Sequence, residues 1–294
     1  MKFKILNHSL ANFLGLFLFL FFPGLIMSQT TDNTSFENNL KDSIQESSEF
    51  NFLMIGVSYT NNNIKYKTLD ADIKMPTFTG DFSYYHKSGF WASVNYANYF
   101  KANITTYETE IKLGYQHTFL DFIDLDFSYA HHDFKGDKNY EGISYNHSIN
   151  GSINLNSKYI SFTADAYSMY GLSNNYFSEL GTSFNLDIDD LFFKNDFFLF
   201  NPGISASFGT DDWIFEDFTP VQRFGRKRFL KGQGYSTGTF SYQSLSFLVP
   251  IIYSYNSISL SLSWFYNIPS NKLKALNWKD QNGFMISVFY SPSL

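Results

Sequence analysis

Residues 257–264 alternate strictly between serine and a large apolar residue. Successive side chains of a β-strand point to opposite faces, so Ile258, Leu260, Leu262 and Trp264 would form one apolar face, and the four serines a polar face. The pattern therefore predicts a strand that separates an apolar environment from a wet one.

The same alternation recurs along most of the chain. In residues 107–119 the odd positions are mainly apolar, whereas Glu108, Glu110 and Lys112 occupy the even face. Runs of this kind, separated by turn residues, predict strands. We predict twelve, over residues 50–59, 78–85, 90–100, 107–119, 123–131, 143–155, 159–170, 176–188, 197–208, 240–253, 257–267 and 284–290.

The composition fits a membrane-embedded β-sheet. Aromatic residues make up 20% of the chain, with 35 Phe and 21 Tyr, and such residues favour strands and form the interfacial girdles of barrels. Charged residues are only 16%, which is low for a globule exposed to water. No run of about 18 apolar residues occurs, so the sequence predicts no helical membrane span.

Cysteine content and net charge narrow the chemistry. The chain has no cysteine, which excludes disulfides, thiolate metal sites and the lipid-bearing cysteine of a lipoprotein. Its formal charge of -6 gives no support to a nucleic-acid partner.

The N-terminus has the layout of a secretory signal. Lys2 and Lys4 precede an apolar core at about 13–22, which a Pro-Gly pair ends shortly before the small residue Ser28. We predict a cleavable signal peptide over residues 1–28. An uncleaved anchor is the alternative, and the short core disfavours it. The polar residues 29–49 predict a flexible periplasmic segment, followed by the barrel over residues 50–294.

The connections between the predicted strands are short on one side and mostly longer on the other, the longest being 209–239. With the leader, the alternating strands and the last strand, which ends at Phe289 and Tyr290, the chain resembles Gram-negative outer-membrane β-barrel proteins. The resemblance implies an all-β fold: a closed, antiparallel, up-and-down transmembrane barrel of about twelve strands. It also implies an integral outer-membrane location with both termini in the periplasm.

The strand faces direct a set of carboxylates toward the lumen, with Lys112 as the main opposing charge. Two arrangements are open: a wet, cation-preferring passage, or a closed lumen in which the carboxylates pair with Lys112 or with basic loop residues. The lumen-lining candidates are Glu108, Glu110, Lys112, Asp126, Asp165 and Glu179.

The longest connection carries a basic cluster interleaved with aromatic residues. Its basic members are Arg223, Arg226, Lys227, Arg228 and Lys231. Such a cluster can meet lipopolysaccharide, fold into the acidic lumen, dock a partner protein, or stay solvated. The acidic residues 211–217 upstream could pair with it instead.

Three patterns suggest catalysis or ligand binding, and each has a simpler interpretation. Residues 146–151 resemble the His-x-Ser-Asn-Gly segment of outer-membrane phospholipases, but His147 and Ser148 are adjacent and would point to opposite sides of the wall. His131 and His132 also diverge, which predicts a rim or loop position without metal. The glycines at 232 and 234 predict a flexible loop.

We therefore expect no enzyme, no metal and no cofactor. The leading expectation is a porin-like channel for small polar or cationic solutes. The alternative is a non-conducting structural or interaction subunit of a larger outer-membrane complex. The expected partners are outer-membrane lipid and lipopolysaccharide, with other envelope proteins in the alternative, and no nucleic acid.

Overall fold

The computed structural model describes residues 51–62, 76–101, 104–136, 145–171, 174–215 and 219–292. The predicted signal peptide and N-terminal segment lie outside these residues. The strands are β1 Phe52–Thr60, β2 Thr77–Tyr85, β3 Phe90–Lys101, β4 Ile104–Phe119, β5 Ile123–Gly136, β6 Tyr145–Asn156, β7 Ile160–Gly171, β8 Asn175–Phe184, β9 Leu186–Asp189, β10 Asp196–Phe200, β11 Gly203–Gly209, β12 Ser241–Tyr255, β13 Ile258–Pro269 and β14 Gln281–Tyr290.

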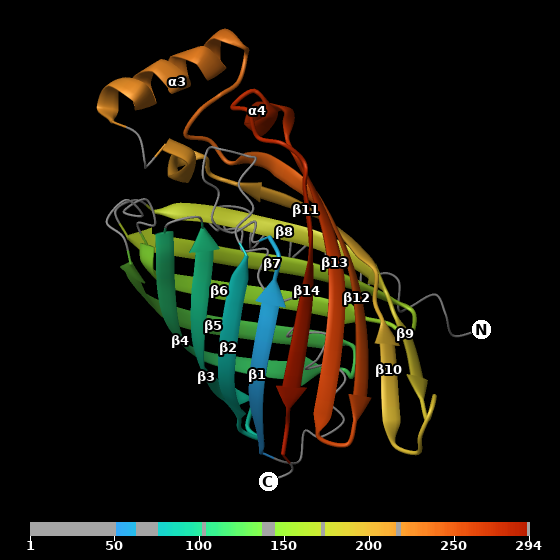
Figure 1. Ribbon diagram of the computed structural model, residues 1–294. Helices are drawn as coiled ribbons and strands as arrows, with labels where there is room; N and C mark the ends of the chain where they lie inside the picture. Colours follow the sequence, from blue (N-terminus) through green and yellow to red (C-terminus); the bar gives the residue numbers. More distant parts are fainter. Residues whose placement is uncertain are drawn as a thin grey trace, which may run out of the picture.

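The strands form one closed antiparallel barrel (Figure 1). The last strand, β14, pairs with the first, β1, which closes the sheet, and among the described strands only β9 has a single neighbour, β10. The segments β8 and β9 together form one wall strand, as do β10 and β11, so the 14 segments make a barrel of 12 strands. This confirms the predicted fold class. A closed barrel is what a bilayer demands, because hydrocarbon offers no partner to an unpaired strand edge.

The break between β10 and β11 explains how β12 can contain Pro250. The sequence predicts a strand end or bulge at Pro250, whereas β12 runs through it. Phe200 pairs with Ile251 and Gly203 with Leu248, so Pro250 lies opposite the break, which contains Pro202. Neither proline has an N–H that the interrupted ladder would leave unpaired.

The two faces of the wall follow the predicted alternation. On β13, Ile258, Leu260, Leu262 and Trp264 are 48–56% exposed on the outer face. The inward Ser261 and Ser263 are each 1% exposed. The apolar face is thus available to lipid, and the serine face lines the interior. Among the described residues, no helix is long and apolar enough to cross a membrane.

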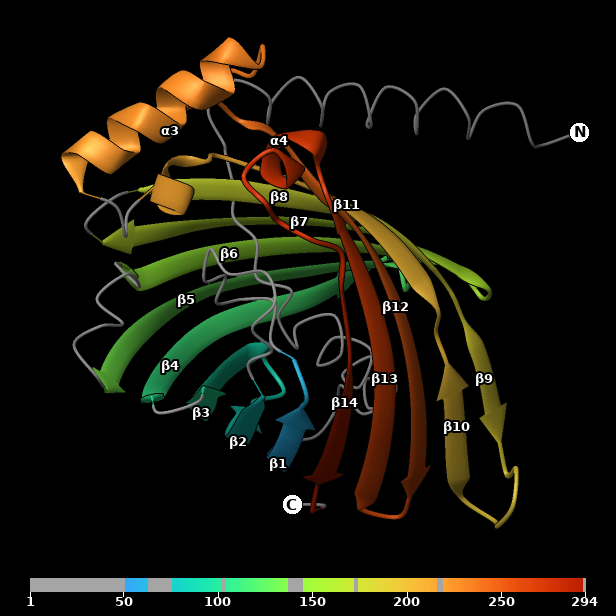
Figure 2. The ribbon, with the colours of Figure 1, turned by 45° about the horizontal axis from the view of Figure 1, so that its top comes forward.

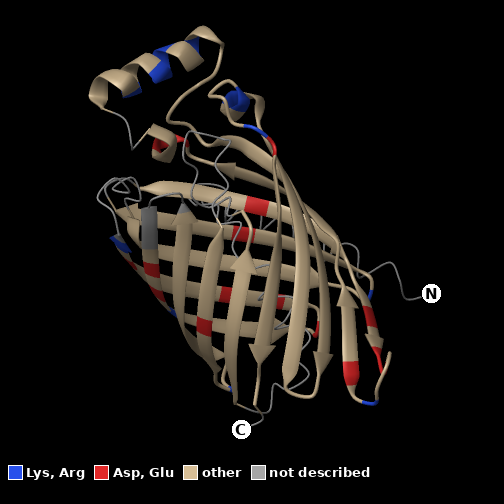
Figure 3. Cartoon of the chain, viewed as in Figure 1, with Lys and Arg blue, Asp and Glu red and all other residues tan. Residues whose placement is uncertain are grey.

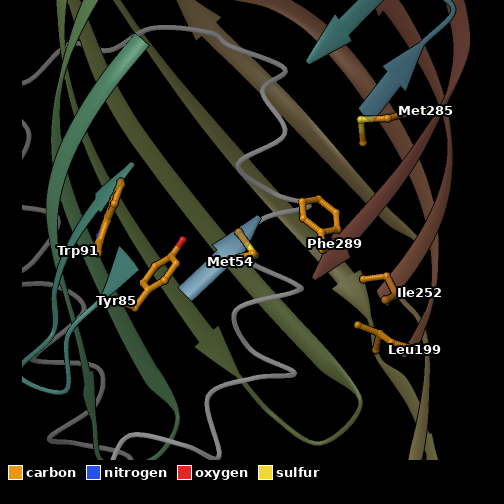
Figure 4. Close-up of a cluster of buried hydrophobic side chains, with 7 residues drawn as sticks. All are labelled: Met54, Tyr85, Trp91, Leu199, Ile252, Met285 and Phe289. Carbon is orange, nitrogen blue, oxygen red and sulfur yellow. The ribbon is translucent and has the colours of Figure 1, made fainter. Parts of the chain in front are cut away.

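One part of the inner wall carries a cluster of apolar side chains, which we call the apolar patch. It comprises Met54, Tyr85, Trp91, Leu199, Ile252, Met285 and Phe289 (Figure 4). Two of its rings lie over glycines of the neighbouring strand. A Cβ atom on Gly56 would be 2.5 Å from the Phe289 ring, and one on Gly114 would be 2.3 Å from the Trp91 ring. These glycines allow the rings to lie against the wall.

Gly114→Val is expected to lower the free energy of unfolding by about 1–3 kcal/mol, because the new side chain would collide with the Trp91 ring. The displaced indole would also lose its hydrogen bond to Asp126, in which Nε1 lies 3.0 Å from Oδ2. Urea unfolding in lipid vesicles, followed by tryptophan fluorescence, measures both effects. Gly80→Val is the matched control, since a Cβ there meets nothing within 4 Å. Equal stability of the two variants would contradict the packing argument.

The connections after β11 and β13 form a small cap at one end of the barrel (Figure 2). It contains the 3-10 helix η3 Asp212–Phe215, the helix α3 Pro220–Gly232 and the short helix α4 Asn271–Lys274. Its core comprises Ile214, Phe215, Leu230, Leu273, Leu276 and Trp278. The sequence predicts only a loop over 209–239. The helix α3 lies within it and begins with a capping box between Thr219 and Gln222, with a proline in its first turn. We call the end that carries the cap the long-loop end, and the opposite end the short-turn end.

Candidate functional site

Polar residues on successive strands form a continuous row across the inner wall, which we call the polar row. Each member is the direct register partner of the next. From β4 to β12 they are Gln116, Asp126, Ser152, Asp165, Glu179, Ser207 and Ser244. The row holds three carboxylates and no lysine or arginine.

The polar row crosses the lumen obliquely. Neighbouring strands lie about 4.8 Å apart, and barrel strands tilt by about 35–45° from the barrel axis. A row that runs perpendicular to tilted strands therefore climbs along the axis. Gln116 lies near the β4–β5 turn at the short-turn end, and Ser244 lies near the start of β12 at the long-loop end. Asp126, Asp165 and Glu179 thus occupy successive depths.

Charge is divided between the barrel and its cap (Figure 3). Acidic residues are spread over the barrel strands, whereas basic residues gather on α3 and α4. Within the cap, Asp212 already pairs with Lys227 of the basic cluster.

A second polar group lies nearer the long-loop end, around His132. The His132 Nδ1 atom lies 2.8 Å from Glu108 Oε1 and 3.4 Å from Glu110 Oε2. Tyr99 donates its hydroxyl to Glu108 Oε2 at 2.5 Å. Lys112 Nζ lies 3.0 Å from Glu110 Oε1. This agrees with the charge-paired arrangement for Glu108 and Glu110, since buried charges need partners.

His132 also reaches a serine on the next strand. Its Nε2 atom lies 2.9 Å from Ser148 Oγ on β6. The sequence predicts a rim or loop position for His132, but β5 continues to Gly136 and places His132 in the interior. His147 lies on the outer face instead, where its Nδ1 is 2.7 Å from the Tyr129 hydroxyl. Ser148 is therefore paired with a histidine distant in sequence, not with its neighbour.

Glu108, Glu110 and His132 also present three potential metal ligands. Their ligand atoms lie within 4.8 Å of one another, and all three side chains are buried. Carboxylate and imidazole groups suit several divalent ions. However, both ring nitrogens of His132 and a carboxylate oxygen of Glu110 already have hydrogen-bonding or ionic partners. We therefore regard this group as a hydrogen-bonded network.

The basic cluster of α3 is split between internal and exposed contacts. Arg223 Nε donates to the Phe215 carbonyl at 3.2 Å, and Lys227 Nζ lies 2.9 Å from Asp212 Oδ1. The acidic and basic halves of the long connection therefore do pair in part. Arg228 and Lys231 are exposed, as is Phe224 on the same helix. Arg226 is half-buried.

No protein-family model matches the chain, and no curated protein sequence matches it either. Solved structures do share its fold. One is LpxR from Salmonella typhimurium, with a TM-score of 0.51, 10% sequence identity, and coverage of 81% of this chain and 99% of that chain.

Two porins also match. The KdgM porin has a TM-score of 0.49 at 10% identity, with coverage of 81% of this chain and 98% of that chain. The NanC porin has a TM-score of 0.44 at 10% identity, with the same coverage of 81% and 98%. At such identities these likenesses concern the fold alone.

Proposed function

Because the chain folds as a closed β-barrel of twelve strands with an apolar outer face, we propose that it is an integral outer-membrane protein that forms a narrow, porin-like passage for small cations and polar solutes. The observation that carries the proposal is the polar row. Its carboxylates Asp126, Asp165 and Glu179 follow one another from strand to strand without an intervening lysine or arginine.

The physical argument is the cost of burying charge. An ionised carboxylate away from water is stable only beside a cation, a donor or water. Asp165 and Glu179 are direct register partners across the β7–β8 ladder. Their negative charges repel each other, so a nearby counter-ion would stabilise both. A hydrated cation that moves along the row would meet that need at successive depths. Charges that line a pore in this way set its selectivity.

The apolar patch would restrict the passage. Its members lie on β1, β2, β3, β10, β12 and β14, whereas the acids of the polar row lie on β5, β7 and β8. A lumen of this size lies between filled barrels of about eight strands and open porins of 16–18 strands. The apolar patch would act as a constriction that water and ions cross poorly, which favours small solutes.

Replacing both central acids, Asp165→Asn with Glu179→Gln, is expected to remove most of the cation preference. Each charge contributes about 1 kcal/mol of attraction to a cation at ~4 Å in a watery environment. Loss of one charge therefore lowers local cation occupancy roughly five-fold. Single-channel recordings in planar bilayers under a salt gradient report the change as a shift of the reversal potential toward zero.

Asp133→Asn is the matched control, because it removes one carboxylate from an exposed site where Asp133 is paired with Lys135 at 3.1 Å. Its reversal potential should equal that of the wild type. Discrete conductance steps with the same selectivity in all variants would show that ions do not follow the polar row.

A non-conducting interaction subunit is the second candidate. The exposed face of α3 favours it, since Val221 is 81%, Phe224 68% and Phe229 49% exposed beside Arg228 and Lys231. An apolar and basic helix face of this kind suits an anionic lipid headgroup or an envelope protein. Electrical silence of the folded protein at all voltages, with stoichiometric copurification of an envelope protein, would favour this candidate over the channel.

A further inference from the structure

We propose that Ser148, His132 and Glu108 form a serine-nucleophile site in the lumen that hydrolyses short-chain carboxylic esters. The proposal does not depend on the channel function, because the site lies toward the long-loop end and needs access from that side only. Ser148 lies near the first residue of β6, and His132 near the last residue of β5.

The hydrogen bonds run in the order that base catalysis requires. Ser148 Oγ lies 2.9 Å from His132 Nε2, and His132 Nδ1 lies 2.8 Å from Glu108 Oε1. Two carboxylates face Nδ1, and ionised carboxylates only accept, so Nδ1 carries the ring proton. Nε2 then has a free electron pair and can accept the proton of Ser148. Nucleophile, base and orienting acid are thereby aligned.

Glu108 is itself held in place. Its second oxygen, Oε2, accepts the hydroxyl proton of Tyr99 at 2.5 Å, and Glu108 is 3% exposed. The neighbouring Glu110 is neutralised by Lys112 at 3.0 Å, which leaves Glu108 as the acid that orients His132. An orienting acid needs this kind of support, because its task is to fix the ring and the tautomer.

The residue beside Ser148 on the next strand is small. Lys112, Ala130 and Ser148 are register partners on β4, β5 and β6, so the small Ala130 lies between the other two. A carbonyl over Ala130 would have the hydroxyl of Ser148 on one side. On the other side, the ammonium of Lys112 would stabilise the oxyanion.

Apolar side chains lie on the other flank. Met169 is the β7 register partner of Ser148, and the ring centroids of Tyr145 and His132 are 4.9 Å apart. A short acyl chain can rest against these groups, while its alcohol part faces the polar wall. This selects an ester of a small acyl group with a polar alcohol.

The reaction balances without any further reagent. The Ser148 Oγ–H bond breaks as its proton moves to His132 Nε2, and Oγ forms a bond to the ester carbonyl carbon. The carbon–alkoxide bond then breaks, and His132 returns the proton to the leaving alcohol. Water repeats the sequence on the acyl-serine, which releases a carboxylic acid and restores the serine.

The test uses the full-length protein, refolded in detergent and labelled with a fluorophosphonate probe, which reacts only with activated serines. The expected result is one label per chain, mapped to Ser148 by mass spectrometry, with turnover of p-nitrophenyl butyrate. Ser148→Ala should abolish both. His132→Gln should slow labelling about 100-fold or more. Glu108→Gln should slow it by a comparable factor, because its amide would donate to Nδ1 and move the ring proton to Nε2.

Ser128→Ala is the control, since Ser128 is a buried serine on β5 that belongs neither to the polar row nor to the serine site, and its labelling should equal that of the wild type. Retained heat-modifiable mobility in gels shows that each variant is folded. A wild-type protein that is folded but not labelled would overturn the proposal. This is the result expected if both ring nitrogens of His132 carried protons, because the ring could not then accept the proton of Ser148. Loss of turnover on addition of a chelator would also overturn it, in favour of a metal held by Glu108, Glu110 and His132.

Discussion

Asp211→Ala is expected to loosen the cap at the long-loop end by about 3–5 kcal/mol, the usual effect of leaving one member of a buried ion pair without its partner. Asp211 is 0% exposed, and its Oδ2 atom lies 2.7 Å from Lys272 Nζ. Its other oxygen accepts the backbone N–H of Gly238 at 2.6 Å. These contacts connect the start of the cap to α4 and to the segment after α3, so all three should open together.

Hydrogen exchange measured by mass spectrometry is the direct readout for the cap. Amides of α3 and α4 should exchange faster in Asp211→Ala by the factor that corresponds to the lost free energy, while those of the barrel strands remain protected. Asp212→Asn is the control, because the Asp212–Lys227 pair has side chains that are 45% and 32% exposed. An exposed pair of this kind contributes at most about 1 kcal/mol. Similar exchange in the two variants would refute the assignment of Asp211 as the anchor.

Leu262→Arg is expected to lower the free energy of unfolding from lipid vesicles by about 2–4 kcal/mol, the cost of a cationic side chain on the lipid face near the bilayer midplane. Leu262 lies near the centre of β13 and is 49% exposed on the outer face. Guanidinium titration monitored by fluorescence measures the loss.

Tyr255→Arg provides the depth control. Tyr255 is 43% exposed at the end of β12, where the same substitution should cost about 0–1 kcal/mol. A larger loss of free energy at Leu262 than at Tyr255 would show that the cost of the arginine depends on its depth in the hydrocarbon. If both variants lost the same free energy, the outer face of β13 would not lie in a bilayer.

The twelve strands, their approximate ends and the direction of most side chains were predictable because the signal is local. A strand places neighbours on opposite faces, so the alternation of Ser257–Trp264 can be interpreted without knowledge of any other strand. The same reasoning placed Glu108, Glu110, Lys112, Asp126, Asp165 and Glu179 on the inner face. Hydrocarbon outside and water or polar groups inside are the only surroundings that suit such a pattern.

Two of the differences from the prediction have identifiable reasons. The fifth strand was expected to end at His131, since the polar residues after it are typical of a loop, yet β5 continues to Gly136 and brings His132 inside. The helix α3 was expected to be a loop because of its glycines and charges. Its capping box, Thr219 with Gln222, was the local signal that could have revealed it.

The sequence by itself therefore determined which residues face lipid and which face the lumen, because that choice depends only on parity along each strand. Tertiary structure alone decided which inward residues meet. The polar row and the contact between Ser148 and His132 both depend on strand register, which is set by the pairing of strands around the closed barrel. A register shift of two residues in one strand would keep every side chain on its own face of the wall. It would, however, separate the residues that meet in both arrangements.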